Sequence, residues 1–102
     1  MARYLTRQKG LPKAEEKMLH ALGASNRVTY IRHGKEYFRP YRNYFCAGTQ
    51  GDKDLDAAHK AGYVTRKIYP GYNRDGVFYH VTDEGREHLE EVTGCHIYPE
   101  ER

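Results

Sequence analysis

The sequence predicts one small α+β domain whose elements follow the order helix, β-hairpin, helix, β-hairpin, helix. Its 102 residues are the length of a single domain with a single core. Three segments carry apolar residues at helical spacing, between residues that start and stop helices. Between these segments lie two pairs of β-rich runs, each pair joined by turn-forming residues.

The first helix is predicted over residues 12–22. Pro12 suits the first helical position, where its missing N–H costs nothing, and Gly23 marks the end. Apolar residues recur along one side of this helix, which we therefore expect to be buried. They are Leu11, Ala14, Met18 and Leu22.

The first hairpin is predicted from the runs 27–32 and 35–41, with His33-Gly34 as a two-residue loop. Glycine accepts a positive φ freely, and histidine tolerates it better than most residues. This register places Tyr30 opposite Tyr37, and strand alternation then sorts the two faces. The inward face would hold Thr29, Ile31 and Phe38. The outward face would hold Tyr30, Arg32, Lys35, Tyr37, Arg39 and Tyr41.

The second half of the chain predicts a helix, a hairpin and a last helix. Asp52 can cap a helix over residues 53–61 that stops at Gly62. Two β-rich runs, 63–69 and 77–82, flank a turn-rich loop. Thr82 can cap the last helix, which would bury Leu89 and Val92 and stop near Gly94. Residues 41–51 match no element.

The domain boundaries follow from where periodicity begins and ends. Residues 1–10 are basic and aperiodic and are predicted to form a flexible arm. Residues 11–94 form the single domain, and residues 95–102 are predicted to be a frayed C-terminal tail.

Charge is divided unevenly along the chain, although the formal net charge is only +3. Residues 1–51 hold ten Lys/Arg and three Asp/Glu, a formal charge of +7. Residues 52–102 hold seven Lys/Arg and eleven Asp/Glu, a formal charge of −4. This split favours an anionic partner for the first half. The alternative is that the two halves attract each other within the fold.

Several function classes lack their sequence signals. No apolar run approaches the ~20 residues needed to span a bilayer, and the N-terminus lacks the apolar centre of a secretory signal. Cys46 and Cys95 are too few for a disulfide scaffold, so we expect reduced thiols in a cytosol. Neither metal-ligand spacing, nor a phosphate-cradling glycine loop, nor an oriented nucleophile–base pair is evident. We therefore expect a binding protein without cofactor or metal, and not an enzyme.

Three runs in the second half follow one another in a characteristic order. In residues 55–66 a helix carrying Leu55 ends at Gly62 and leads into a strand carrying Arg66. Residues 73–76 form a loop with Arg74, and residues 79–89 contain a Thr-x-x-Gly turn that opens a helix. This order resembles the back half of a winged helix in the MarR-like and PadR-like bacterial regulators. The resemblance implies that helix 53–61 enters the DNA major groove and that Arg74 reaches the adjacent backbone or minor groove.

Two features depart from that pattern. A winged helix has a further helix before the reading helix, where this sequence predicts a hairpin. The presumed reading helix also carries Asp52, Asp54 and Asp56, and carboxylates repel DNA phosphates.

The run Arg42-Asn43-Tyr44-Phe45 before a short helix, with a later Tyr-x-Val-Thr-x-x-Gly run, is similar to small proteins encoded by phages and prophages. This resemblance implies an accessory, regulatory or counter-defence role in the cytosol of a bacterial host.

The basic and aromatic face of the first hairpin is the leading candidate site, for nucleic acid. Its cations would meet phosphates and its tyrosines would stack on bases or sugars. The alternative is ordinary cross-strand pairing, because Tyr30 opposite Tyr37 stabilises a hairpin without a ligand. The full candidate set for DNA comprises Tyr30, Arg32, Lys35, Tyr37, Arg39, Arg42, Arg66 and Arg74.

A protein partner is the competing interpretation. The chain would then be an inhibitor of a host protein or defence system, in the manner of an anti-CRISPR protein. Tyrosine and arginine are favoured at protein interfaces. The candidate residues for this mode are Asp52, Asp54, Asp56 and Tyr41, the acids docking on a basic channel of the target. Regulators of the resembled type often dimerise through terminal helices, so a homodimer also stays open.

Overall fold

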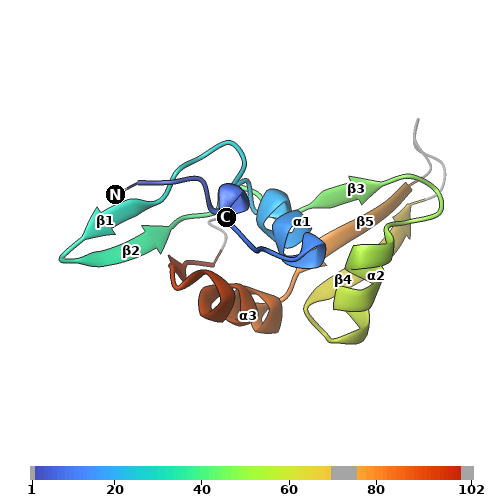
Figure 1. The fold of residues 1–102 in the computed structure, drawn as a ribbon. Coiled ribbons are helices and arrows are strands. Elements are labelled where there is room, and N and C mark those ends of the chain that lie inside the picture. The colour runs from blue at the N-terminus through green and yellow to red at the C-terminus, as the bar shows by residue number, and fades with distance from the viewer. Residues whose placement is uncertain (1, 70–75, 100–102) are drawn as a thin grey trace.

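The computed structural model describes residues 2–69 and 76–99, which form a small α+β domain of three α-helices and two three-stranded sheets (Figure 1). The helices are α1 (Lys13–Ala21), α2 (Lys53–Lys60) and α3 (Asp83–Thr93), preceded by a 3₁₀ turn, η1 (Leu5–Arg7). The strands are β1 (Tyr30–Arg32), β2 (Lys35–Phe38), β3 (Phe45–Ala47), β4 (Val64–Tyr69), β5 (Gly76–Val81) and β6 (His96–Ile97).

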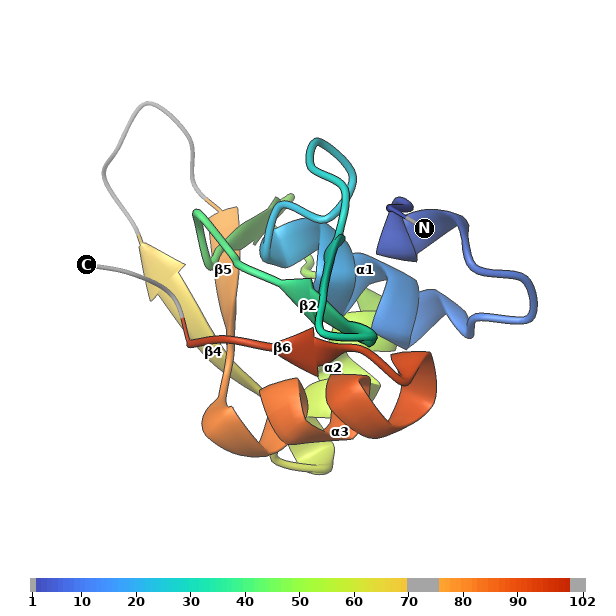
Figure 2. The same ribbon diagram turned by 90° about the vertical axis from the view of Figure 1, so that its left-hand side faces the viewer.

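The two sheets occupy opposite ends of the molecule (Figure 1). The first sheet has the strand order β1-β2-β6, and the second has the order β3-β5-β4. Helices α1 and α2 lie on one side of the second sheet, and α3 runs below β6 (Figure 2). The hairpin β1–β2 therefore projects from one end, and the hairpin β4–β5 from the other.

One hydrophobic core joins these layers. Side chains from η1, from each α-helix and from both sheets meet in it. Each fully buried Leu, Ile or Phe side chain contributes about 1.5–3 kcal/mol, so the elements stabilise one another through this cluster. Its large buried members include Leu5, Met18, Leu19, Phe38, Leu55, Tyr79, Leu89 and Ile97.

The first hairpin has the predicted register, with Tyr30 opposite Tyr37. His33 and Gly34 form the loop, with φ values of +52° and +75°. Thr29 and Phe38 are buried, as expected for the inward face. Ile31 was also expected to pack inward, and that prediction is wrong, because Ile31 is 46% exposed. It lies near the tip, beyond the part of the hairpin that packs on the core.

The predicted elements of the second half are confirmed. The Asp52 carboxylate caps α2 by accepting a hydrogen bond from the Leu55 amide at 3.1 Å. Thr82 Oγ1 caps α3 by accepting one from the Gly85 amide at 3.0 Å. A Cβ at Gly85 would collide with the Tyr63 carbonyl oxygen, so glycine lets α3 lie close to the chain entering β4.

The segment that matched no predicted element contains β3, which pairs antiparallel with β5. It is anchored by Asn43, whose side chain bonds both backbone groups of Val81, at 2.7 Å to the amide and 2.9 Å to the carbonyl oxygen. The predicted order of helices and hairpins is therefore present, with an additional edge strand on the second sheet.

Both terminal segments differ from the prediction. Within the described residues, the expected flexible arm packs on the domain: Leu5 is fully buried, and the carbonyl oxygen of Arg3 accepts from the Thr29 amide at 2.8 Å. The expected frayed tail contains β6, which pairs parallel with β2. Gly94 caps α3 with a φ of +72° and turns the chain back, which buries Cys95 and Ile97.

None of the helices in residues 2–69 and 76–99 has the length and apolar character to cross a bilayer. Helix α3, with 11 residues, falls well short of the ~20 that a span requires.

The packing of the C-terminal segment predicts unequal reactivity of the two thiols. Burial raises the pKa of the Cys95 thiol to about 12, whereas Cys46 is exposed. A maleimide followed by mass spectrometry should label Cys46 in the native protein and both cysteines in urea, because only a thiolate reacts. Equal labelling of both in the native state would contradict the packing of β6.

Candidate functional site

The outer face of the first sheet carries a ladder of aromatic rings. The Tyr37 ring lies between those of Tyr30 and Tyr98, with ring centroids 5.6 and 5.7 Å apart and nearly parallel planes. His96 meets the edges of this ladder, 5.6 Å from Tyr37 and 4.6 Å from Tyr98. Because β1 and β6 flank β2 on opposite sides, both faces of the Tyr37 ring are covered. Tyr37 is therefore a structural member of the ladder, and Tyr30 offers the ring at its exposed end.

Cations line the same face. Arg32 lies directly opposite Lys35 in the sheet, and both side chains are exposed. Neither has a carboxylate partner among the described residues, and like charges opposite each other in a sheet are destabilising. The Arg39 guanidinium lies over the Tyr98 ring, 4.6 Å from its centroid. The structure thus brings the predicted hairpin residues together as one cationic, aromatic surface.

The carboxylate of this hairpin is held on the other face. Glu36 accepts hydrogen bonds from Arg3 at 2.9 Å and from Thr29 Oγ1 at 2.7 Å. The Arg3 guanidinium holds the pKa of the Glu36 carboxyl below its usual value of 4.5. Glu36 is therefore unable to neutralise Arg32 or Lys35.

The acids of α2 are also occupied within the fold. The Lys17 ammonium lies 2.7 Å from both the Asp52 and the Asp54 carboxylates. The Asp56 carboxylate accepts from the Tyr79 hydroxyl at 2.6 Å and from Arg66 Nε at 3.0 Å. Helix α2 consequently does not present these three carboxylates as a free acidic surface.

These contacts leave α2 with a different exposed side. Its outward ridge consists of Lys53, Ala57 and Lys60, each of them exposed, at spacings of four and three. Arg66, a predicted contact for nucleic acid, is bound to Asp56 instead. Arg74, the predicted wing contact, lies outside the described residues.

The acidic surface of the molecule is on α3. Glu84, Glu87 and Glu91 are exposed, lie on one side of the helix, and have no cationic partner in the described part of the chain. Within the described residues the charges are therefore separated in space: Glu84, Glu87 and Glu91 on α3 have no cationic partner, and Arg32 and Lys35 on the first sheet have no carboxylate partner.

The remaining two candidates lie apart from the hairpin. Pro40 ends β2, and Tyr41 and Arg42 turn away from the first sheet toward the C-terminal end of α1. Tyr41 was expected on the outward face of the hairpin, and that placement is wrong. The Tyr41 ring instead packs against Gly23, with the Arg27 guanidinium 4.3 Å from its centroid.

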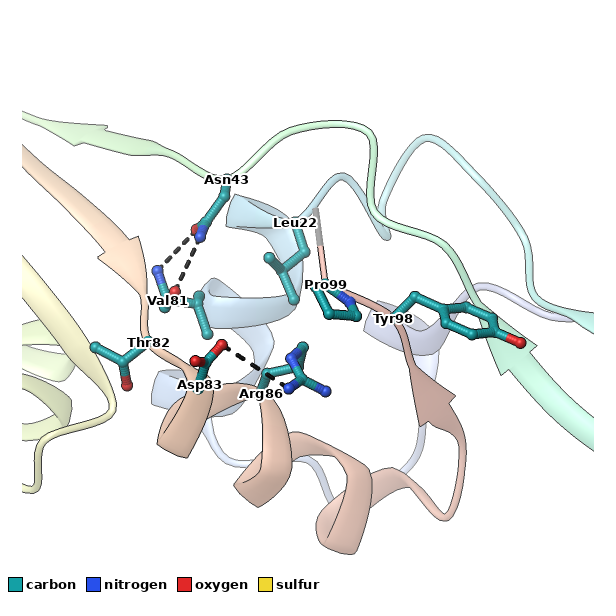
Figure 3. Close-up of a pocket in the computed structure, with 8 residues that line it drawn as sticks. All are labelled: Leu22, Asn43, Val81, Thr82, Asp83, Arg86, Tyr98 and Pro99. Carbon is teal, nitrogen blue, oxygen red and sulfur yellow. Dashed lines mark hydrogen bonds and ion pairs between the residues drawn. The ribbon is translucent and has the colours of Figure 1, made fainter. Parts of the chain in front are cut away.

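A cavity of ≈ 340 Å³ lies between β5, the start of α3 and the C-terminal segment (Figure 3). Most of the polar groups around it bind one another. Asn43 is bound to Val81, and Arg86 donates to the carbonyl oxygen of Ile97 at 2.9 Å. These contacts hold the C-terminal segment, and we assign the cavity no ligand.

No group of three or more His, Cys, Asp and Glu side chains in residues 2–69 and 76–99 is placed to hold a metal ion.

No protein-family model, no curated protein and no solved structure matches this chain.

The sequence analysis missed His96 and Tyr98 as members of the aromatic ladder, because residues 95–102 were predicted to be frayed. A signal was present: buried Cys95 and Ile97 alternate with His96 and Tyr98, which is the pattern of a strand with one buried face. Arg27 and Tyr44 were also not predicted as site residues: Arg27 is the first residue of the predicted hairpin run 27–32 and was not assigned to its outward face, and Tyr44 lies in residues 41–51, which matched no element.

Asp52 and Asp54 allow a matched test of the α2 anchor. Both carboxylates contact Lys17, but only Asp52 also caps the helix. We expect Asp52→Ala to reduce the free energy of unfolding in urea by about 1–2 kcal/mol, and Asp54→Ala by less than about 1 kcal/mol. Equal losses would contradict the capping role.

The contribution of the Asp52 carboxylate to the free energy of unfolding should depend on pH in a direction that its pKa determines. Burial raises the pKa of the Asp52 carboxyl, but Lys17 and the Leu55 amide outweigh this and bring it below its usual value of 3.8. A lowered folded pKa gives stability that is present above the unfolded pKa and lost as pH falls through the folded pKa. The stability gap between the parent protein and Asp52→Ala should therefore narrow in acid.

Proposed function

We propose that this chain is a non-enzymatic DNA-binding protein whose main contact surface is the outer face of the first sheet. The observation that carries the proposal is the pair Arg32 and Lys35, two exposed cations placed opposite each other without a carboxylate to separate them. Such a pair costs stability in the free protein. A row of phosphates would relieve that repulsion, because each cation could then face an anion.

The arrangement of the other charges supports an extended anionic partner. Glu36 is paired with Arg3 on the opposite face, so it does not neutralise Arg32 or Lys35. Helix α3, which carries the exposed Glu84, Glu87 and Glu91, lies below β6 (Figure 2). A polyanion approaching this end would meet Arg32, Lys35 and the Arg39–Tyr98 pair, with the exposed ring of Tyr30 beside them.

A winged-helix-like architecture is part of the proposal. Its support is the second sheet, where an edge strand, a helix and a two-stranded hairpin follow one another and the strand order is β3-β5-β4. The exposed ridge of Lys53, Ala57 and Lys60 would suit a helix lying against DNA, since its neighbouring acids are bound to Lys17 and Arg66. One departure from the winged-helix pattern is present in the structure as well. A further helix should precede the reading helix, but α2 is the only helix between β3 and β4.

A regulatory role of phage type rests on the sequence resemblances of residues 42–45 and 79–85. The competing function, inhibition of a host protein, loses the acidic α2 surface that motivated it, because Asp52, Asp54 and Asp56 have partners within the fold. A protein partner would have to use α3 or the tyrosine ladder instead.

The double variant Arg32→Gln/Lys35→Gln tests the proposal. We expect its affinity for a short arbitrary DNA duplex to fall at least about tenfold, since a hydrogen bond to a charged group contributes about 1.5–3 kcal/mol. The slope of log affinity against log salt should become shallower by about two. Melting temperature should be unchanged or higher, because the repulsion between the two side chains is gone. Fluorescence anisotropy and thermal unfolding supply these measurements.

The matched control is Lys9→Gln/Lys13→Gln, which removes the same charge from exposed lysines outside the first sheet. This control should change affinity much less. Equal loss in both double variants would mean that net charge, and not the hairpin face, governs binding. Full affinity in Arg32→Gln/Lys35→Gln would remove the hairpin from the interface.

A further inference from the structure

Four side chains alternate in a stack at the C-terminal end of α1: Arg27, Tyr41, Arg42 and Tyr44. The Arg27 guanidinium carbon lies 4.3 Å from the centroid of the Tyr41 ring. The Arg42 guanidinium carbon lies 5.5 Å from the Tyr41 centroid and 5.6 Å from the Tyr44 centroid. We call these four residues the Arg–Tyr stack. It lies outside the face of the first sheet on which the proposed DNA contact rests.

The central ring of the Arg–Tyr stack is held firmly. Gly23 has a φ of +86°, and a Cβ at that position would overlap the Tyr41 ring, so only glycine leaves room for it. The Asn26 side-chain amide donates to the Tyr41 hydroxyl at 2.8 Å. Tyr41 therefore serves as a fixed support against which the two guanidinium groups are oriented.

The two guanidinium groups keep most of their hydrogen-bonding capacity. Each has five N–H donors. Arg42 donates one to the His20 carbonyl oxygen at 2.9 Å, and its Nε is buried with no partner. Arg27 has neither a hydrogen-bond nor an ion-pair partner for its guanidinium in residues 2–69 and 76–99. The stack is thus a pair of oriented cations without a neutralising carboxylate.

Tyr44 adds an open aromatic surface. Its side chain is 50% exposed, although it directly precedes β3 and its amide donates to the Ala21 carbonyl oxygen at 3.1 Å. The backbone is therefore fixed while the ring remains half open to solvent beside Arg42. An exposed ring next to a cation matches a nucleotide, which carries both an aromatic base and a phosphate.

A groove adjoins this region. His20, whose carbonyl oxygen binds Arg42, also lines a groove of ≈ 400 Å³ together with Arg7, Glu16 and Ser25, and with Lys17, which is bound to Asp52 and Asp54. The Arg7 guanidinium lies over the Tyr4 ring, 4.6 Å from its centroid, and repeats the pairing seen in the stack. A chain of nucleotides could continue from the stack along this groove.

We infer that the Arg–Tyr stack is a binding site for single-stranded nucleic acid, with Arg27 and Arg42 contacting phosphates and Tyr44 stacking on a base. This inference rests on the proposed function. It adds that the protein also binds nucleic acid in single-stranded form, and that it does so at a second surface. In a duplex the faces of the bases are covered by neighbouring base pairs, so the Tyr44 ring could contact base edges but could not stack on a base. Unpaired bases offer their faces to aromatic rings and to guanidinium planes. An acidic peptide would use the two arginines and leave Tyr44 without a role.

Three variants test the site against a labelled single-stranded oligothymidine in a fluorescence anisotropy titration. Tyr44→Leu keeps an apolar side chain but removes the stacking surface, and we expect about tenfold weaker binding, since one stacked base contributes about 1–3 kcal/mol. Arg27→Gln alone removes an exposed cation that makes no hydrogen bond or ion pair in the described residues and contacts only the face of the Tyr41 ring, so we expect the fold to be preserved and affinity to fall several-fold. Arg27→Gln/Arg42→Gln should weaken binding more than tenfold.

An abasic oligonucleotide of the same length separates stacking from charge. It should bind more weakly than oligothymidine, and Tyr44→Leu should not weaken it further. If abasic and base-carrying strands bound equally well, the site would recognise phosphate only, as a phosphopeptide or any polyanion would supply, and the inference would be overturned. Oligothymidine binding that is unchanged in Tyr44→Leu and in Arg27→Gln would overturn it as well.

The control Lys9→Gln/Lys13→Gln accounts for the loss of net charge, and the melting temperature of each variant confirms that it is folded. Failure of the inference is distinguishable from failure of the proposed function. If duplex binding depends on Arg32 and Lys35 while the stack variants leave single-strand binding intact, only the inference fails. If the parent protein binds neither duplex nor single strand, both fail.

Discussion

The pairing of carboxylates with cations inside the fold decides which charges this protein presents. Lys17 binds Asp52 and Asp54, Arg66 binds Asp56, and Arg3 binds Glu36. The Lys17 and Arg3 contacts join elements that are distant in the sequence, so they also position α2 against α1 and the N-terminal arm against the first hairpin. Because these acids are used in this way, Arg32 and Lys35 of the first sheet, the guanidinium groups of the Arg–Tyr stack, and Lys53 and Lys60 of α2 have no carboxylate partner in residues 2–69 and 76–99. The charge division along the chain therefore has two outcomes: Lys17 of the basic half binds Asp52 and Asp54 of the acidic half, whereas Arg32, Lys35 and Arg27 stay on the surface without a carboxylate among the described residues.

The first sheet separates these side chains onto an inner and an outer face. β2 is its central strand, and alternation sends Phe38 and Glu36 inward while Tyr37 and Arg39 face outward. β6 extends the outer face with His96 and Tyr98, which complete the aromatic ladder. The middle ring of the ladder, Tyr37, is covered on both sides. Arg32 and Lys35 lie opposite each other next to the hairpin loop, so the strand register places their two charges side by side.

Local signals predicted much of the fold. The His33-Gly34 loop determines the hairpin register because both residues adopt positive φ, and Asp52 and Thr82 cap their helices through hydrogen bonds three residues ahead. Features that depend on distant contacts were not predictable. The parallel pairing of β6 with β2 joins Tyr37 to His96, and Lys17 lies 35 positions before Asp52. No spacing rule connects such positions. The candidate site was predicted in part for the same reason: the hairpin cations follow from alternation, whereas Tyr98, Arg27 and Tyr44 join their clusters only through tertiary packing.

The central claim is that the uncompensated cations form the contact surface for nucleic acid, and a two-dimensional amide NMR titration of the labelled protein with a short DNA duplex tests it most directly. The account predicts the largest shift changes at residues 30–39, with His96 and Tyr98 following, and little change along the acidic side of α3 at Glu84, Glu87 and Glu91. Changes concentrated on α3, with residues 30–39 unmoved, would contradict it.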